Sequence, residues 1–428
     1  MIARAALFLL GSACTTAACG LETSAELIVD PDAGSAFDAN DPVVGVDADV
    51  TDSGTPEADA TIDASPNDAD AAPTASCPSG TTLLHERTAC AAALAPPPSL
   101  SSALANATPG SIVSLGGMNE GTAPCLPVLV CRPSDAPTLL FSDSPESPVS
   151  DGVLYADTTV ANGRYRIYVY HTNGSGPQRK FPVVVLNQGA QPAKVTIVRR
   201  GLASPSKSYV SVGKSVIVDW FVDRPPVEVT VPAGQRVLLD ATQAGLVAKK
   251  DELVHAIFDV VTSAPVKISV VSVGAAADAV AVTAGLSLLP RDPNHQRGTF
   301  VGADVLLTLA GSQLKGVQRL RLGAGEIDAT LEGIDAPTGQ PQKLLGNYGM
   351  LYRVALALPS PARAALSARG GAWGGVMRIP AGSIALPLAS DVLATTTDAI
   401  ALGAATNETK LMTAGGSNLP VDLFFLTP

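Results

Sequence analysis

Aromatic side chains and long apolar stretches are both scarce in this 428-residue sequence. Aromatic residues make up 4% of the chain, and no run of 18 or more apolar residues occurs, which excludes a helical membrane span. The 39 Gly and 34 Pro residues do not suit a helical bundle. With 46% hydrophobic residues, the chain is nevertheless long enough to bury two or three domain cores.

Recognisable catalytic motifs are also missing. The sequence has no Gly-x-Ser-x-Gly elbow and no Gly-x-Gly-x-x-Gly loop, which argues against a serine hydrolase and a dinucleotide site. It has four histidines, His85, His171, His255 and His295. His295 is the best metal candidate, but it lies in a segment that we interpret as a linker, and a metal needs three or four convergent ligands. The sequence therefore predicts no metal and no cofactor, and it favours a non-enzymatic protein.

The net charge of −11 belongs to one segment. From Gly20 to Ser76 there are fourteen Asp and Glu residues and no Lys or Arg. Without these fourteen and Arg4, 25 acidic residues face 27 basic residues, so the rest of the chain is close to neutral. An acidic chain without a basic stripe is not expected to bind nucleic acid.

The first nineteen residues have the pattern of a bacterial export signal, with Arg4, a short apolar run over residues 5–10, and small residues before Cys19. Thr16-Ala17-Ala18-Cys19 resembles the lipobox of bacterial lipoproteins, and Cys14 is a second candidate for lipidation. The resemblance implies a signal peptide at residues 1–18 and a lipid anchor in the cell envelope. Since Gly20 rather than Asp follows the cysteine, the outer membrane is favoured; a secreted protein is the alternative.

Residues 19–76 are predicted to be a disordered tether. They are rich in Ala and Asp, and few large apolar groups with one sign of charge cannot support a core. As a random coil the segment would span about 40 Å. Such a tether would hold a folded body away from a membrane surface.

Four cysteines follow the tether: Cys77, Cys90, Cys125 and Cys131. An even number in an exported protein indicates disulfides. Three pairings are possible, and proximity in sequence favours Cys77–Cys90 and Cys125–Cys131. Gaps of twelve, thirty-four and five residues do not suit a zinc site. We expect residues 77–150 to form an irregular, disulfide-stapled lead-in with a few short strands.

From residue 151 the sequence becomes rich in β-strand patterns. Val227-Glu228-Val229-Thr230-Val231 alternates strictly between apolar and polar residues, which is typical of a half-buried strand. Strands are expected at 164–172, 183–186, 194–200, 215–221, 227–231, 236–240, 253–261 and 266–273. Such closely spaced strands without intervening helices predict an antiparallel β-sandwich over residues 151–290.

A second set of strand patterns follows Pro290. Strands are expected at 303–309, 317–322, 350–358, 376–379 and 423–426. The fold class predicted from the sequence is therefore all-β, with a second sandwich over residues 291–428 in series with the first. No period of 20–50 residues recurs, which excludes a solenoid or a propeller.

Several short segments after residue 151 resemble an uncharacterised class of bacterial exported β-sandwich proteins. They are Tyr170-His171-Thr172-Asn173, Pro205-Ser206-Lys207-Ser208-Tyr209, His295-Gln296-Arg297-Gly298-Thr299-Phe300, Asn347-Tyr348-Gly349 and Ala368-Arg369-Gly370-Gly371. The resemblance implies an envelope location and assigns no catalytic residue.

Few side chains of the body indicate a ligand. Trp220 is expected in the core, whereas Trp373 lies in a glycine-rich stretch that could expose it to a ligand, although we favour a packed plug. The basic residues Arg164, Arg166, Arg199, Arg200, Lys249 and Lys250 are interpreted as scattered, solvated strand faces. The acid-rich stretch of a plausible hydrolase comprises Asp219, Asp240, Asp251, Glu252 and Asp259.

These observations lead to two functional hypotheses. The first is a membrane-anchored, non-enzymatic protein that binds or scaffolds another envelope protein or a glycan at the cell surface. The alternative is a carbohydrate-binding or carbohydrate-active exported protein. A retaining hydrolase would need two carboxyl groups about 5–5.5 Å apart, which spacing along a sequence cannot establish.

Overall fold

The strands of this chain gather into four β-sheets. The computed structural model describes residues 76–87, 95–118, 123, 125–309, 316–323, 328, 330–356, 362–379, 382–404 and 408–427. Within these residues strands far outnumber helices, and nearly all neighbouring strands run antiparallel. The predicted all-β, antiparallel-rich fold is confirmed.

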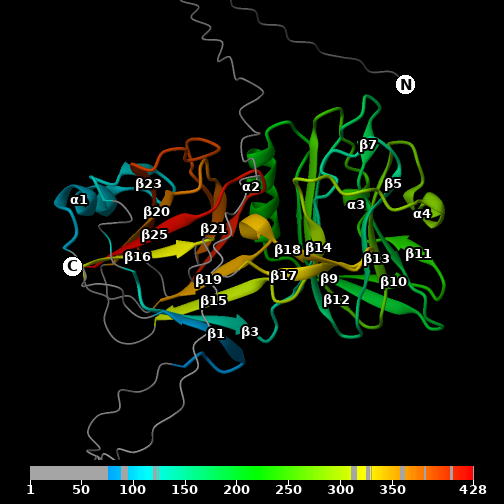
Figure 1. The fold of residues 1–428 in the computed structure, drawn as a ribbon, viewed down its shortest axis with the longest axis horizontal. Coiled ribbons are helices and arrows are strands. Elements are labelled where there is room, and N and C mark those ends of the chain that lie inside the picture. Colours follow the sequence, from blue (N-terminus) through cyan, green and yellow to red (C-terminus); the bar gives the residue numbers. More distant parts are fainter. Residues whose placement is uncertain are drawn as a thin grey trace, which may run out of the picture. The chain divides into compact units, whose positions relative to one another are not determined.

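Two of the sheets form what we call the first lobe (Figure 1). The larger sheet has the strand order β10-β9-β12-β6-β4-β14-β17-β18, and the smaller has the order β11-β8-β13-β5, with β7 also paired to β13. Their strands are β4 (Thr138–Ser142), β5 (Gly152–Thr158), β6 (Arg164–Thr172), β7 (Arg179–Lys180), β8 (Val183–Leu186), β9 (Ala193–Leu202), β10 (Val227–Val231), β11 (Arg236–Leu238), β12 (Leu253–Thr262), β13 (Lys267–Gly274), β14 (Arg297–Phe300), β17 (Glu332–Asp335) and β18 (Gln340–Lys343).

The other two sheets form the second lobe. Their orders are β1-β3-β15-β19-β24-β21-β22 and β16-β25-β20-β23-β2. The strands are β1 (Thr81–Arg87), β2 (Ile112–Ser114), β3 (Val128–Pro133), β15 (Asp304–Leu309), β16 (Val317–Leu322), β19 (Leu351–Ala355), β20 (Arg363–Ala368), β21 (Gly375–Ile379), β22 (Gly382–Leu386), β23 (Asp398–Ala404), β24 (Thr409–Thr413) and β25 (Val421–Leu426).

Helices in the described part of the chain are few and mostly short. They are α1 (Pro98–Asn106), α2 (Tyr209–Trp220), α3 (Ala241–Ala244), α4 (Ala279–Val282) and the 3-10 turns Thr283–Gly285 and Leu345–Asn347. None of these helices has the length and apolar character needed to cross a bilayer.

Helix α2 corrects one prediction, because residues 215–221 were expected to be a strand. Val212, Val216 and Trp220 recur every four residues, and all three are buried on the side of α2 that packs on β9 and β12. The packing is so close that a Cβ atom at Gly201 would lie 2.2 Å from the Val216 carbonyl oxygen. A run of β-branched residues is a poor helix former by propensity alone, and here tertiary packing overrides that preference.

Sheet membership does not follow chain order. The expected lead-in, residues 77–150, supplies β1, β2 and β3 to the second lobe and β4 to the first. The expected boundary near residue 290 falls between β13 and β14, but β14, β17 and β18 still join the larger sheet of the first lobe. Strands adjacent in sequence are neighbours in a sheet only about two-thirds of the time, so pairing between distant strands could not be deduced.

A disulfide joins Cys77 to Cys131, with their Cα atoms 6.0 Å apart. The preference for pairing cysteines close in sequence was therefore wrong. The reason is strand pairing. Strand β1 runs antiparallel to β3 with Leu83 opposite Cys131, and the chain turns just before β1, so that Cys77 lies within disulfide distance of Cys131. Cys125 is also disulfide-bonded, and Cys90 lies outside the described residues.

The central strands β6 and β12 of the larger sheet are buried on both faces. One face packs on the smaller sheet through residues such as Ile167 and Val169. The other face carries Tyr168 and Tyr170, which belong to a core cluster shared with α2 and both sheets of the second lobe. The lobes therefore share one continuous apolar core.

Two histidines are buried in this region in the neutral form. Nδ1 of His171 lies 2.9 Å from the Pro145 carbonyl oxygen, and Nδ1 of His255 lies 2.7 Å from that of Val169. A carbonyl can only accept, so Nδ1 carries the proton in both rings. Burial lowers the pKa of His171 to about 3 and that of His255 to about 4.

The depressed pKa of His255 predicts a dependence of stability on pH. Between the unfolded value of 6.5 and the folded value of about 4, the unfolded chain binds more protons, so stability rises with pH and falls on acidification. We expect His255→Gln to reduce this slope by about 1.4 kcal/mol per pH unit. Urea unfolding of wild type and variant across this interval measures it, and an unchanged slope would contradict the prediction.

Candidate functional site

A row of charged residues crosses three adjacent strands of the first lobe. The register places Arg166 of β6 opposite Asp259 of β12, and Asp259 opposite Arg199 of β9. Arg164 lies two residues before Arg166, so both side chains are on one face of β6. This alternation puts three arginines and one carboxylate together on the sheet face that meets the second lobe.

Arg166 is the centre of this row, with 1% of its side chain exposed. Its Nε and Nη2 atoms donate to the two Asp259 oxygens at 2.8 and 3.0 Å. Its Nη1 donates to Asp304 of β15 at 2.8 Å and to the Gly349 carbonyl at 2.9 Å. Burial acts to lower the pKa of Arg166, but the two carboxylates outweigh it and raise that pKa above the ordinary value.

Trp220, the last residue of α2, packs on the same guanidinium. The Cζ atoms of Arg166 and Arg199 lie 4.7 and 5.1 Å from the centroid of the Trp220 ring. Cations over an indole face are attracted by its quadrupole, most strongly when desolvated. Helix α2 thus fixes the position of both arginines.

The second lobe provides the facing wall. Arg353 of β19 and Lys410 of β24 are opposite each other in the sheet register. About a third of each side chain is exposed, and both form ion pairs with Glu408, at 3.2 and 3.7 Å. Asp304 and Leu351, which are adjacent in the sheet, connect this wall to Arg166.

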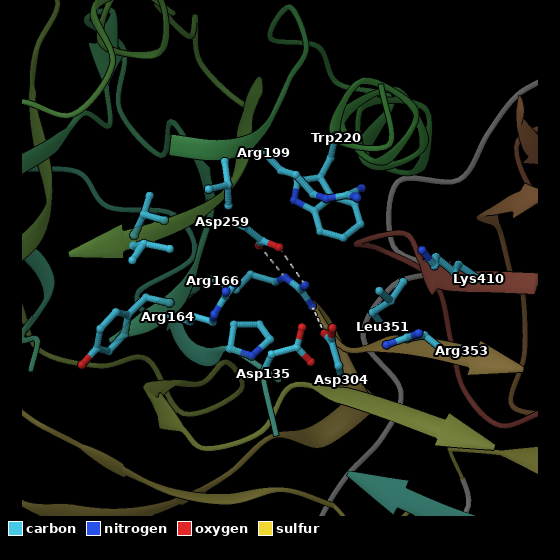
Figure 2. Close-up of a pocket in the computed structure, with 15 residues that line it drawn as sticks. Asp135, Arg164, Arg166, Arg199, Trp220, Asp259, Asp304, Leu351, Arg353 and Lys410 are labelled. Atoms are coloured by element: carbon cyan, nitrogen blue, oxygen red, sulfur yellow. Dashed lines mark hydrogen bonds and ion pairs between the residues drawn. The ribbon is translucent and has the colours of Figure 1, made fainter. Parts of the chain in front are cut away.

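Together these walls enclose a cleft of about 420 Å³ (Figure 2). Figure 2 shows Arg199 and Trp220 on one side of it and Arg353 and Lys410 on another, with the dashed contacts of Arg166 between them. Five basic residues line it (Arg164, Arg166, Arg199, Arg353 and Lys410) against three acidic ones (Asp135, Asp259 and Asp304), an excess of two positive charges. Its volume is in the range of small-molecule sites.

The sequence interpretation of these arginines as scattered, solvated charges was wrong for Arg166, which is buried. Arg164, Arg166 and Arg199 belong to one cleft, whereas Arg200, Lys249 and Lys250 do not line it. The available signal was the period of two in Arg164-Tyr165-Arg166-Ile167-Tyr168-Val169-Tyr170, which places arginines and tyrosines on one strand face. The partner strand β9 and the wall from the second lobe could not be found this way.

Trp373, the possible ligand contact, is 0% exposed and packs in the shared core. It therefore presents no surface to a ligand.

The acids of the hydrolase hypothesis are each bound to other groups. Asp219 pairs with Arg224, Asp240 with Arg200, Asp251 with Lys207, Asp259 with Arg166, and Glu252 accepts from the Lys249 amide. The structure gives no support to a carboxylate pair among them.

Cys14 and Cys19 lie outside the described residues. Nε2 of His295 lies 2.7 Å from Glu146 and its Nδ1 2.8 Å from Asp292. Within the described part of the chain no group of three or more His, Cys, Asp or Glu side chains is arranged to hold a metal.

Comparison with known proteins gives no family. No family model matches the chain, and no curated protein matches it. Among solved structures, a mannose 6-phosphate isomerase from Bacillus subtilis is 8% identical, covers 70% of this chain and 75% of its own, and has a TM-score of 0.14. A vicilin from Corylus avellana is 10% identical, with coverages of 67% and 86% and a TM-score of 0.11. Scores this low support no conclusion about fold or function.

The buried cluster predicts a large effect of replacing Arg166. In Arg166→Met the carboxylates of Asp259 and Asp304, which are 14% and 15% exposed, would lose their shared cation. Breaking a buried ion pair from one side costs about 3–5 kcal/mol. We expect a loss of this size in the free energy of unfolding, measured with urea.

A matched triple variant separates charge from packing. Arg166→Met combined with Asp259→Asn and Asp304→Asn removes the uncompensated charges and should recover much of the loss. Equal instability of the single and triple variants would show that the charges are not the cause.

Proposed function

We propose that this protein is a non-enzymatic binding protein of the cell envelope whose cleft between the lobes binds an anionic ligand. The observation that carries the proposal is the convergence of Arg164, Arg199, Arg353 and Lys410 from both lobes on one cleft. These cations surround a guanidinium that is already neutralised by Asp259 and Asp304. Three of the four also pair with exposed carboxylates, Arg353 and Lys410 with Glu408 and Arg199 with Asp223, so an anionic ligand would take the place of these surface partners.

The chemistry of the cleft favours a carboxylate or phosphate group. Arginine presents donors in a planar fork that matches both groups, and it stays charged at any physiological pH. Arg199 is held in place by the Trp220 ring, and its pair with Asp223 is long, at 3.9 Å. A partly prearranged donor loses less conformational entropy when the ligand arrives. For a protein at a cell surface, an acidic glycan is a ligand of this class.

We also propose that the chain is exported and anchored by lipid at Cys19, with the outer membrane as its location. The support is the export-signal pattern of residues 1–19 and the lipobox-like Thr16-Ala17-Ala18-Cys19. Three acyl chains would anchor the protein stably, because each buried CH₂ contributes about 0.8 kcal/mol. The acidic segment after Cys19 would then place the binding cleft away from the membrane.

Binding to the cleft can be measured by titration calorimetry with oligogalacturonate, a carboxylated glycan, and with inorganic phosphate. Wild type should bind at least one of them. Arg164→Gln with Arg353→Gln should raise the Kd at least about tenfold, since a hydrogen bond to a charged group contributes about 1.5–3 kcal/mol.

The control is Lys250→Gln with Lys267→Gln, which removes two exposed cations outside the cleft. It has the same change in net charge and should keep the wild-type Kd. If both double variants weaken binding equally, the attraction is a general charge effect, and the assignment of the cleft is overturned.

The anchor is tested by growth with a palmitate analogue that can be detected after labelling. The wild-type chain should incorporate the label, and Cys19→Ala should not, because its sulfur is the expected attachment point. Cys14→Ala is the matched control and should be labelled as wild type. Absence of label in wild type would refute the anchor but would leave the binding cleft untouched.

A further inference from the structure

A second cavity, of about 130 Å³, opens at the other end of the same strand face. Arg166, Tyr168 and Tyr170 follow one another along β6, with Arg166 in the basic cleft and both tyrosines in this cavity. The two cavities share no lining residue. The second is lined by four aromatic rings, by the acidic groups of Asp143 and Glu146 and by the His295 imidazole, so aromatic rings and carboxyl groups take the place of the arginines of the basic cleft.

Asp143 is the unusual group of this cavity. The residue is 9% exposed, and its Oδ1 atom has no hydrogen-bond partner among the described residues. A buried carboxyl oxygen without a partner carries a desolvation cost that a bound ligand can remove. Burial, and secondly the neighbouring Glu146 carboxylate, raise the pKa of Asp143 well above its ordinary value.

Glu146 is held in place by an imidazolium. His295 contacts Glu146 through Nε2 and Asp292 through Nδ1. Asp292 also accepts from the Glu146 amide at 2.8 Å. Burial acts to lower the pKa of His295, but both carboxylates outweigh it and raise the pKa to about 10. One positive charge thus faces two carboxylates and Asp143, so the cluster keeps an excess of acidic groups.

Aromatic rings form the rest of the wall. Phe141 and Tyr168 stack with ring centroids 4.8 Å apart, and Tyr170 and Tyr348 complete the lining. The backbone of Gly415 closes the cavity tightly, because a Cβ atom there would lie 2.3 Å from the Tyr170 ring. Burial raises the pKa of Tyr168, Tyr170 and Tyr348, so the phenols are neutral and their ring faces are electron-rich.

We infer that this cavity is a second binding site, which binds a small organic cation that carries a quaternary or primary ammonium group. Aromatic rings attract a cation through their quadrupole, and this attraction is largest in a desolvated site. The Glu146 carboxylate would provide counter-charge, and a cation beside the unpartnered Asp143 carboxyl, whose pKa burial raises, would favour the ionised form of that group. A neutral sugar would gain from the rings but would leave the acidic excess uncompensated, so the cation is favoured.

The test uses two probes of equal shape. Choline and 3,3-dimethylbutan-1-ol differ in that a positive nitrogen replaces a carbon, and glucose represents a neutral polyol. With the wild-type protein, calorimetry should show choline binding at least about tenfold tighter than its neutral isostere. Equal affinities, binding of glucose without choline, or no binding of any probe would each overturn the proposal.

Variants then locate the site. Asp143→Asn keeps the shape and removes the group that can ionise beside the cation, and it should weaken choline binding at least about tenfold. Tyr348→Leu, on the opposite wall, should weaken it too. Glu228→Gln removes an exposed carboxylate of β10, outside the cavity, and should change nothing. Unfolding midpoints establish that the variants are folded, and unchanged choline affinity in folded Asp143→Asn would contradict the assignment.

Discussion

The buried guanidinium of Arg166 is the contact on which the arrangement of the two lobes depends. It reaches Asp259 in the first lobe and Asp304 and the Gly349 carbonyl in the second. A buried ion pair adds little net stability over an apolar contact, but it penalises any arrangement that separates its members. The shared apolar core provides attraction between the lobes, and this directional contact specifies one register between them.

The same strand face explains why two cavities of opposite character lie in one protein. Side chains at alternate positions of β6 point to the second lobe, and these are first arginines and then tyrosines. Where the arginines lie, the second lobe adds Arg353 and Lys410; where the tyrosines lie, it adds Tyr348 and a glycine turn. The boundary between the lobes therefore combines the shared apolar core with a basic cleft and an aromatic cavity.

Individual strands were well predicted, whereas their partners were not. The predicted strands 164–172, 183–186, 227–231 and 317–322 coincide with β6, β8, β10 and β16, because alternation along a strand records which face is buried. Helix α2 was missed because its valines lie at every second position, which fits the strand period of two, while some of its apolar residues are also four apart, as in a helix. The sequence analysis named the arginines of the basic cleft one by one. Their convergence could not be predicted, because it depends on the register of the strands and on side chains of the second lobe, which are far away in the sequence.

The sequence by itself determined the local features. These are the β-rich composition, the alternation of apolar and polar residues along many strands, the near-neutral charge of the folded part and the export-signal pattern. All of them depend on residues close together in the chain. Only the tertiary structure decided which strands pair, that Cys77 joins Cys131, that Trp373 is buried, and that Arg166 lies between two carboxylates. These features arise from contacts between residues far apart in the sequence. Their free energies depend on burial and geometry, which no single segment specifies.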